Sequence, residues 1–257
     1  MKAMILRRLG NKAKLAGKIQ QYFPRHTTYI EPFFGAGGMF FNKPKAKYNI
    51  ANDSDSDVFN LFMVIRNQKE ALKAQWLKTP ISEDLWNHWK KHKETDPIMQ
   101  AIRFLLLSNF GYMGKAQTLV FGRGNSARLL YENIDKTYEF IFGVEFMNAD
   151  FRDVFKKISL KDENALQNTF FYCDPPYLDT DNNYQQSFTR KDNYDLFDRL
   201  QQSGCRWAMS EFDHPYILQQ AKERELHVHI IGERKNLSNR RTEILITNYQ
   251  KPQGTLF

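Results

Sequence analysis

The sequence predicts an α/β fold with a mainly parallel sheet, and three observations support this. Short apolar runs rich in β-branched and aromatic residues recur along the chain. Segments with helical periodicity separate most of them. One stretch, from about residue 60 to 140, breaks this alternation. Because strands that alternate with helices form a parallel sheet, we expect an open α/β domain that carries one insert.

The elements can be assigned in order from the apolar runs. Seven runs are predicted as strands: Tyr29–Glu31, Tyr48–Ala51, Val144–Met147, Phe170–Cys173, Arg206–Ser210, His227–Ile231 and Glu243–Thr247. The helical segments are Lys14–Tyr22, Val58–Asn67, Asn193–Gln202 and Pro215–Arg224. No clear helix joins the last two strands, which predicts an antiparallel hairpin. The expected fold is therefore a Rossmann-like, seven-stranded, mainly parallel sheet with an antiparallel last strand and helices on both faces.

The domain organisation follows from the same alternation. Residues 1–58 and 142–257 are predicted to form the main domain, and residues 59–141 a mostly helical insert with a basic, glycine-rich turn region. Three tryptophans in the insert, Trp76, Trp86 and Trp89, have partly helical spacing, which favours a place in the core.

Composition bounds the class of protein. The 257 residues carry a net charge of +8, which favours a polyanionic partner, most often nucleic acid, over a basic enzyme of another kind. The two cysteines form neither a disulfide framework nor a metal pair, and the histidines are not grouped, so no metal is expected. No apolar run approaches the roughly 18 residues of a membrane span. A cytoplasmic protein with no membrane partner is expected, associated with the nucleoid if it binds DNA.

A glycine loop follows the first predicted strand and reads Glu31-Pro32-Phe33-Phe34-Gly35-Ala36-Gly37-Gly38. In open α/β sheets, ligands bind beyond the carboxyl ends of the strands, and glycines there let the backbone approach a ligand closely. The spacing matches neither GxGxxG nor a Walker motif. The loop therefore predicts a ligand site, and the ligand is not expected to be bound mainly through a nucleotide phosphate.

An acidic residue, Asp53, ends the second predicted strand about 20 positions after the loop, where a ribose hydroxyl acceptor is expected. The alternative is that the segment from Ser54 to Ser56 only caps the next helix. Both can hold, since a cap needs one of these side chains.

The fourth predicted strand ends in Asp174-Pro175-Pro176-Tyr177. Two prolines stop the sheet ladder and make the turn rigid. The carboxylate of Asp174 and the carbonyl of Pro175 can accept the two hydrogens of an amine conjugated to a ring, and Tyr177 can stack on that ring. An ordinary strand-ending turn is the alternative. Cys173, just before the turn, is expected to be a core residue rather than a nucleophile.

Taken together, these motifs resemble the Dam-like DNA adenine methyltransferases of bacteria and phages over the whole chain except the insert, where the likeness is faint. The resemblance implies cofactor contacts by Gly10, Lys12, Glu31, Pro32, Phe33, Gly35, Gly37, Asp53, Asp150 and Phe151. In the Gly10-Asn11-Lys12 segment, Asn11 stands where the family has glycine, and Leu9 where it has an aromatic residue. The implied catalytic residues are Asp174, Pro175, Pro176 and Tyr177, with Tyr184 holding the base.

The resemblance implies an S-adenosylmethionine-dependent enzyme that methylates the N6 amine of a flipped adenine in double-stranded DNA by direct in-line transfer. The motif order makes the insert the target-recognition domain. Substrate contacts are expected from Lys115, Arg123, Arg240 and Arg241. For Arg240 and Arg241 an equal alternative is that they lie at a solvated hairpin tip and contact no substrate. A monomer or weak dimer is expected. Two rivals stay open: an RNA adenine methyltransferase and an inactive DNA-binding relative.

Overall fold

The computed structural model describes residues 5–8, 10–112, 116–122, 124–158, 160, 162–178, 188–235 and 240–251. Contacts divide the chain into two compact units. Unit 1 comprises Met1–Ala13, Gly35–Asn42 and Asp53–Asn148, and unit 2 comprises Lys14–Phe34, Lys43–Asn52 and Ala149–Phe257. The predicted limits of the target-recognition insert, residues 59 and 141, stay a prediction.

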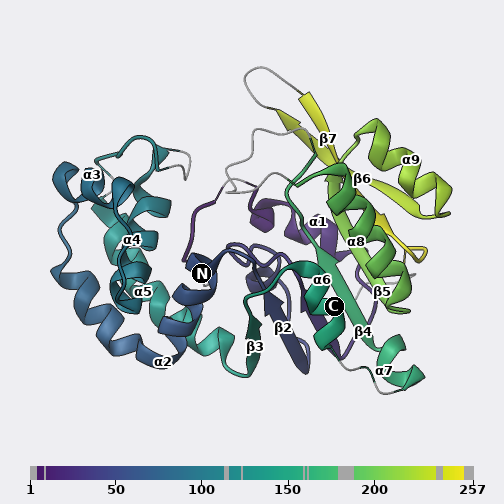
Figure 1. Ribbon diagram of the computed structural model, residues 1–257, viewed down its shortest axis with the longest axis horizontal. Helices are drawn as coiled ribbons and strands as arrows, with labels where there is room; N and C mark the ends of the chain where they lie inside the picture. The colour runs from purple at the N-terminus through teal and green to yellow at the C-terminus, as the bar shows by residue number, and fades with distance from the viewer. Residues whose placement is uncertain are drawn as a thin grey trace. The chain divides into compact units, whose positions relative to one another are not determined.

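Seven strands form one sheet in the order β3-β2-β1-β4-β5-β7-β6 (Figure 1). Their bounds are β1 Thr28–Glu31, β2 Tyr48–Asn52, β3 Val144–Met147, β4 Thr169–Cys173, β5 Arg206–Phe212, β6 His227–Lys235 and β7 Arg240–Thr247. The β1-β2, β1-β4 and β4-β5 pairs are parallel, whereas β7 runs antiparallel to both β5 and β6. The predicted mainly parallel sheet with an antiparallel last strand is confirmed.

The centre of the sheet is covered on both faces. All five residues of β4 are buried, although consecutive side chains point to opposite faces of a strand. Its partner β5 is buried at six of its seven positions. These two apolar runs are therefore strands buried on both faces of the sheet, as is typical of parallel sheets covered on both sides.

The described residues of unit 2 include the helices α1 Ala16–Gln20, α6 Phe151–Lys157, α7 Glu163–Gln167, α8 Arg190–Gln202 and α9 Pro215–Glu223. Helix α8 begins at a capping box, in which Thr189 and Asp192 satisfy each other's backbone N–H groups. Helix α9 packs on β6, and both α8 and α9 lie beside the β5–β6 side of the sheet (Figure 1).

Unit 1 is mostly helical. It holds the short 3-10 helix η2 Phe40–Asn42 and the α-helices α2 Ser56–Lys78, α3 Glu83–Lys91, α4 Pro97–Phe110 and α5 Gly124–Ile141. The 3-10 helix η1 Lys12–Lys14 begins in unit 1, and its last residue is assigned to unit 2. Helix α2 packs against α4 and α5. Trp76, Trp86 and Trp89 are all buried, so the expectation that they are core residues is confirmed.

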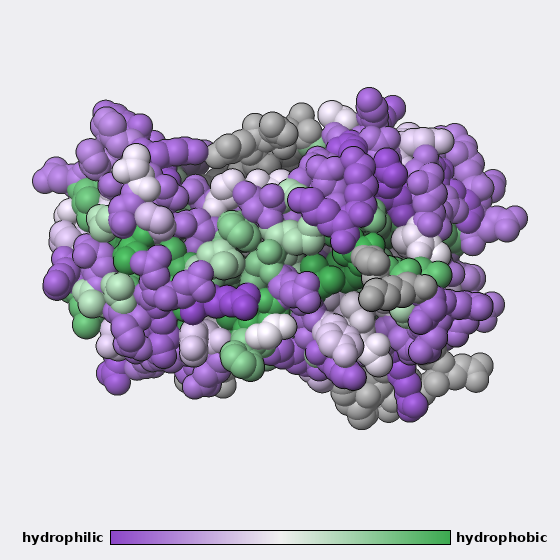
Figure 2. All heavy atoms as spheres, turned by 60° about the horizontal axis from the view of Figure 1, so that its bottom comes forward, coloured by the Kyte–Doolittle hydropathy of each residue, from purple (hydrophilic) through white to green (hydrophobic). Residues whose placement is uncertain are grey.

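Most of the molecular face drawn in Figure 2 is hydrophilic, with apolar residues gathered toward its middle. No helix in the described part of the chain is both long and apolar enough to cross a membrane.

Candidate functional site

The carboxylate of Asp53 holds the part of the glycine loop that belongs to unit 1 by a hydrogen bond. Gly35 and Gly37 have φ angles of +52° and +66°, which other residues rarely adopt. The N–H of Gly35 donates to Oδ2 of Asp53 at 2.6 Å, and the N–H of Asp55 donates to Oδ1 at 2.9 Å. Burial raises the pKa of Asp53, against the opposing effects of Arg8 and these two N–H donors. A carboxylate has further lone pairs, so Asp53 can still accept from a ligand.

The capping predicted for this segment is confirmed, and the cap is Asp55. Its side chain accepts the N–H of Asp57 at 3.0 Å at the start of α2, and it pairs with Arg8 at 2.6 Å. Asp53 and Asp55 therefore have separate tasks. The ribose role predicted for Asp53 remains a prediction.

The N-terminal segment of unit 1 packs directly on the glycine loop. A Cβ on Gly38 would lie 2.0 Å from Oδ1 of Asn11, so only glycine fits there. Asn11 replaces the family's glycine without strain because its Oδ1 accepts the N–H of Ala13 at 2.9 Å and starts η1. Lys12 is buried and donates to the carbonyl of Gly10 at 3.1 Å.

In unit 2, Asn52 ties three segments together at the carboxyl end of β2. Its Nδ2 donates to the carbonyls of Pro32 at 2.9 Å and Ala149 at 3.0 Å, and its Oδ1 accepts the N–H of Ala149 at 3.1 Å. Its own carbonyl accepts the N–H of Phe34 at 2.8 Å. Asn52 is only 1% exposed. It thus fixes the loop after β1 and the residue that precedes Asp150.

Asp150 begins helix α6 and is held by Arg152. The Asp150 carboxylate accepts the N–H of Arg152 at 2.9 Å and also contacts its guanidinium. That guanidinium bonds to Asp192 at 2.5 Å and to Asp195 at 2.9 Å on α8. The exposed Asp150 side chain therefore has a fixed position.

Three phenylalanines form an aromatic cluster next to Asp150. The ring of Phe33 lies 5.4 Å from that of Phe151 and 5.8 Å from that of Phe188, and the last two are 5.8 Å apart. Phe151 is buried, whereas Phe33 and Phe188 are half-buried. An aromatic surface beside a carboxylate fits an adenine ring, which stacks by its faces and donates from its amine.

Asp174-Pro175-Pro176-Tyr177 follows β4 at the carboxyl edge of the sheet. The Tyr177 hydroxyl donates to buried Glu243 of β7, and its ring packs edge-on against Phe212. The next N–H, that of Leu178, donates to buried Glu211 of β5 at 3.0 Å. Burial, then the negative charges of Asp174 and Glu243, raise the pKa of Tyr177, so its hydroxyl stays protonated. Two neighbouring strands therefore hold the turn rigidly.

Cys173 is fully buried, as expected of a core residue. Burial, together with the charges of Glu31 and Asp174, raises the pKa of its thiol. A thiol held in its protonated form is a poor nucleophile.

Several predicted substrate residues lie outside the described residues: Lys115, Arg123, Tyr184 and the side chain of Arg240. Arg241 is described, and its guanidinium lies 5.4 Å from the ring of Phe212. The sequence analysis missed Asn52, Arg152 and Glu211. An asparagine directly before Asp53 at a strand end, and an acid within an apolar strand, were available signals.

Comparisons with known proteins identify the family of this chain. A family model described as D12 class N6 adenine-specific DNA methyltransferase matches residues 9–242. The chain is 27% identical over 281 residues to modification methylase StsI of Streptococcus sanguinis, covering 94% of this chain and 42% of that protein. It is 26% identical over 178 residues to the DNA adenine methylase of Escherichia coli K12, covering 65% and 62%. The chain thus spans less than two thirds of these relatives.

Solved structures give weaker likenesses. The N-terminal domain of human METTL16 in complex with SAH is 12% identical, with a TM-score of 0.37 over 92% of this chain and 67% of that one. The rRNA methyltransferase aviRa of Streptomyces viridochromogenes is 13% identical, with a TM-score of 0.39 over 93% and 83%. Neither likeness is strong enough to bear on function. The family match spans nearly the whole chain, and on that ground the protein belongs to the D12 class N6 adenine-specific DNA methyltransferase family.

Proposed function

We propose that this protein transfers a methyl group from S-adenosylmethionine to the N6 amine of an adenine flipped out of duplex DNA. The observation that carries the proposal is the rigid Asp174–Tyr177 turn at the carboxyl end of β4, anchored by Glu211 and Glu243. Family membership supports the reaction class. Relatives named DNA adenine methylases favour DNA over RNA as the substrate.

Family membership confirms the expectation that S-adenosylmethionine is the cofactor. It supplies an electrophilic methyl group on a sulfonium ion. In unit 2, Phe33 and Phe151 would hold its adenine ring and Asp150 its amine. In unit 1, Asp53 would accept from its ribose, with Gly10, Lys12, Gly35 and Gly37 as neighbouring contacts. Glu31 and Pro32 complete the proposed set.

The chemistry proposed for the turn is the activation of a weak nucleophile. The lone pair of the adenine amine is delocalised into the ring. Asp174 and the carbonyl of Pro175 would accept its two hydrogens and draw the nitrogen toward tetrahedral geometry, with Pro176 keeping the turn rigid. The negative charge of Asp174 also stabilises the amine as it becomes cationic. The base must leave the helix because its amine is engaged in pairing.

The finer features of the substrate complex also remain proposals. Tyr177 and Tyr184 would contact the extruded base, and residues 59–141 would read the target sequence. Lys115, Arg123, Arg240 and Arg241 would contact DNA phosphates. A monomer or weak dimer, in the cytoplasm and associated with the nucleoid, fits these roles.

The test is methyl transfer from labelled S-adenosylmethionine to duplex DNA and to folded RNA, side by side, followed by nucleoside analysis. We expect label in N6-methyladenine from the DNA. Label only in RNA would establish the RNA rival. No transfer to either, by a protein that still binds DNA, would establish the inactive relative.

A further inference from the structure

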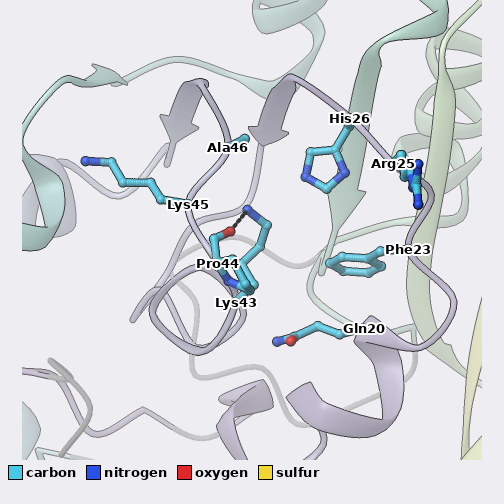
Figure 3. Close-up of a pocket in the computed structure, with 8 residues that line it drawn as sticks. All are labelled: Gln20, Phe23, Arg25, His26, Lys43, Pro44, Lys45 and Ala46. Atoms are coloured by element: carbon cyan, nitrogen blue, oxygen red, sulfur yellow. Dashed lines mark hydrogen bonds between the residues drawn. The ribbon is translucent and has the colours of Figure 1, made fainter. Parts of the chain in front are cut away.

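A cavity of about 310 Å³ lies at the amino edge of the sheet in unit 2, away from the Asp174 turn. Its lining comes from the end of α1, from the segment before β1 and from the segment before β2 (Figure 3). The residues are Gln20, Phe23, Arg25, His26, Lys43, Pro44, Lys45 and Ala46. This volume is at the lower end of the range for small-molecule sites.

The lining is basic. Arg25, His26, Lys43 and Lys45 make up half of the described lining residues, and none of the eight is acidic. Lys43 is only 6% exposed; its ammonium donates to the carbonyl of Pro44 at 2.7 Å and lies 4.0 Å from the centre of the Tyr29 ring. Figure 3 shows Lys43 in the middle, with His26 and Phe23 on one side of it and Lys45 pointing away. The core of the cavity is therefore Lys43, His26 and Phe23.

Burial shifts two titratable side chains of this cavity toward their neutral forms. Burial lowers the pKa of Lys43 to about 8, although the charge of Glu31 opposes the shift. Burial, together with the charges of Lys43 and Arg206, lowers the pKa of His26 to about 4, although the hydrogen bond to Pro24 opposes the shift. The carbonyl of Pro24 accepts a hydrogen bond from Nδ1 of His26 at 2.7 Å, so the neutral ring presents Nε2 as an acceptor.

We propose that this cavity binds the terminal phosphate monoester of a small organic ligand. A phosphate oxygen would pair with the buried ammonium of Lys43, with Arg25 closing on it from the exposed rim. At pH 8 a monoester is a dianion, which these two cations attract more strongly than they attract the monoanion of a phosphodiester. Phe23 and Pro44 provide an apolar wall for the organic part. The lining shares no residue with the proposed methyl-transfer site, although Lys43 and Glu31 interact electrostatically.

Bound phosphate must change the protonation of the site. A dianion beside Lys43 favours its ammonium form. The other charged or titratable groups that act on Lys43 are His26, Tyr29 and Glu31, and Arg206 acts on His26. Near pH 8 about half of Lys43 is neutral before binding. Binding should therefore take up a fraction of a proton at that pH.

The experiment is titration calorimetry of the full chain with phenyl phosphate at pH 8, in two buffers of different ionisation enthalpy. We expect binding with proton uptake. Lys43→Met should weaken binding at least about tenfold, and Arg25→Ala, at an exposed position, should weaken it less. Lys47→Met is the matched control: Lys47 is exposed, precedes the same strand and does not line the cavity, so its variant should bind like the wild type.

Three results would overturn the proposal. The first is no heat of binding to the wild type at millimolar phenyl phosphate. The second is equal binding by the Lys43→Met variant that retains the wild-type melting temperature. The third is equal affinity for a phenyl phosphodiester, or displacement of phenyl phosphate by a short DNA duplex without a terminal phosphate. That result would make the cavity a contact for nucleic-acid backbone instead.

Discussion

The two edges of the sheet in unit 2 have opposite chemistry although the same strands connect them. At the carboxyl edge, β1 ends in Glu31, Asp174 follows β4, and buried Glu211 and Glu243 lie beside the turn. At the amino edge, the segments leading into β1 and β2 bring Arg25, His26 and Lys43 together. A strand of four residues spans about 13 Å. One sheet can therefore present a site suited to cations and another suited to anions.

The two edges also differ in how their polar groups are satisfied. At the carboxyl edge, Asn52, Tyr177 and Leu178 are held by hydrogen bonds that cross between elements. At the amino edge, burial holds Lys43 and His26 away from their usual pKa values. The first arrangement gives fixed geometry, which catalysis needs. In the second arrangement, the burial of Lys43 and His26 costs electrostatic free energy, and a bound anion can offset part of that cost.

The largest predicted effect is at the carboxyl edge. Asp174→Ala should abolish methyl transfer, because the amine loses both an acceptor and the stabilising charge. The variant should still fold and bind S-adenosylmethionine, as shown by its melting temperature and by calorimetry. Asp84→Ala, at an exposed position of α3, is the control and should remain active. Loss of cofactor binding by Asp174→Ala would move this residue from the amine to the cofactor.

Two asparagines of β2 allow the edges to be compared within one strand. Asn52→Ala removes side-chain hydrogen bonds to Pro32 and Ala149, each worth about 1 kcal/mol, so S-adenosylmethionine affinity should fall about tenfold or more. Asn49→Ala removes a similar pair of bonds to Ala46 at the amino edge. It should lower the melting temperature and leave cofactor affinity unchanged. Equal effects on affinity would show that Asn52 acts only through stability.

A smaller effect is predicted for pH dependence at the amino edge. The pKa of His26 is about 4 in the folded protein and 6.5 when unperturbed, so the unfolded chain binds more protons between these values. The stability contributed by neutral His26 is fully present above pH 6.5 and is lost as the pH falls through 4. The loss amounts to up to about 3 kcal/mol.

Urea unfolding at a series of pH values measures this loss. His26→Gln should flatten the dependence between pH 6.5 and 4, whereas His88→Gln, at an exposed position of α3, should leave it unchanged. An unchanged slope in His26→Gln would mean that His26 has its ordinary pKa in the folded state, which would contradict its burial as the cause of the pH dependence.

The sequence predicted the strands well because their apolar runs are short and sharply bounded. Val144–Met147 was predicted with its observed bounds, whereas the last strand begins at Arg240 rather than Glu243 because its first residues are polar and pair only with β6. Helix α2 was predicted to end at Asn67 but continues to Lys78 through a kink at Gln68. The non-helical backbone of Gln68 interrupts the periodicity on which that prediction relied.

For the site, sequence reasoning found the residues that lie in contiguous motifs. Asn52 bonds to a residue 97 positions away, and Arg152 to one 43 positions away, so the local sequence does not identify either partner. The basic cavity depends on the pairing of Thr28 with Tyr48, which brings the two segments before these strands together. Such contacts follow only once the strand order is known.

The most direct measurement is the single-turnover rate of methyl transfer to duplex DNA by Asp174→Asn, beside that of Cys173→Ser. The amide of Asp174→Asn can still accept one hydrogen bond but lacks the negative charge. Its rate should fall at least about a hundredfold, the effect of losing a few kcal/mol of transition-state stabilisation. Cys173→Ser should lose little beyond packing. A fully active Asp174→Asn and an inactive Cys173→Ser would contradict amine methylation at this turn.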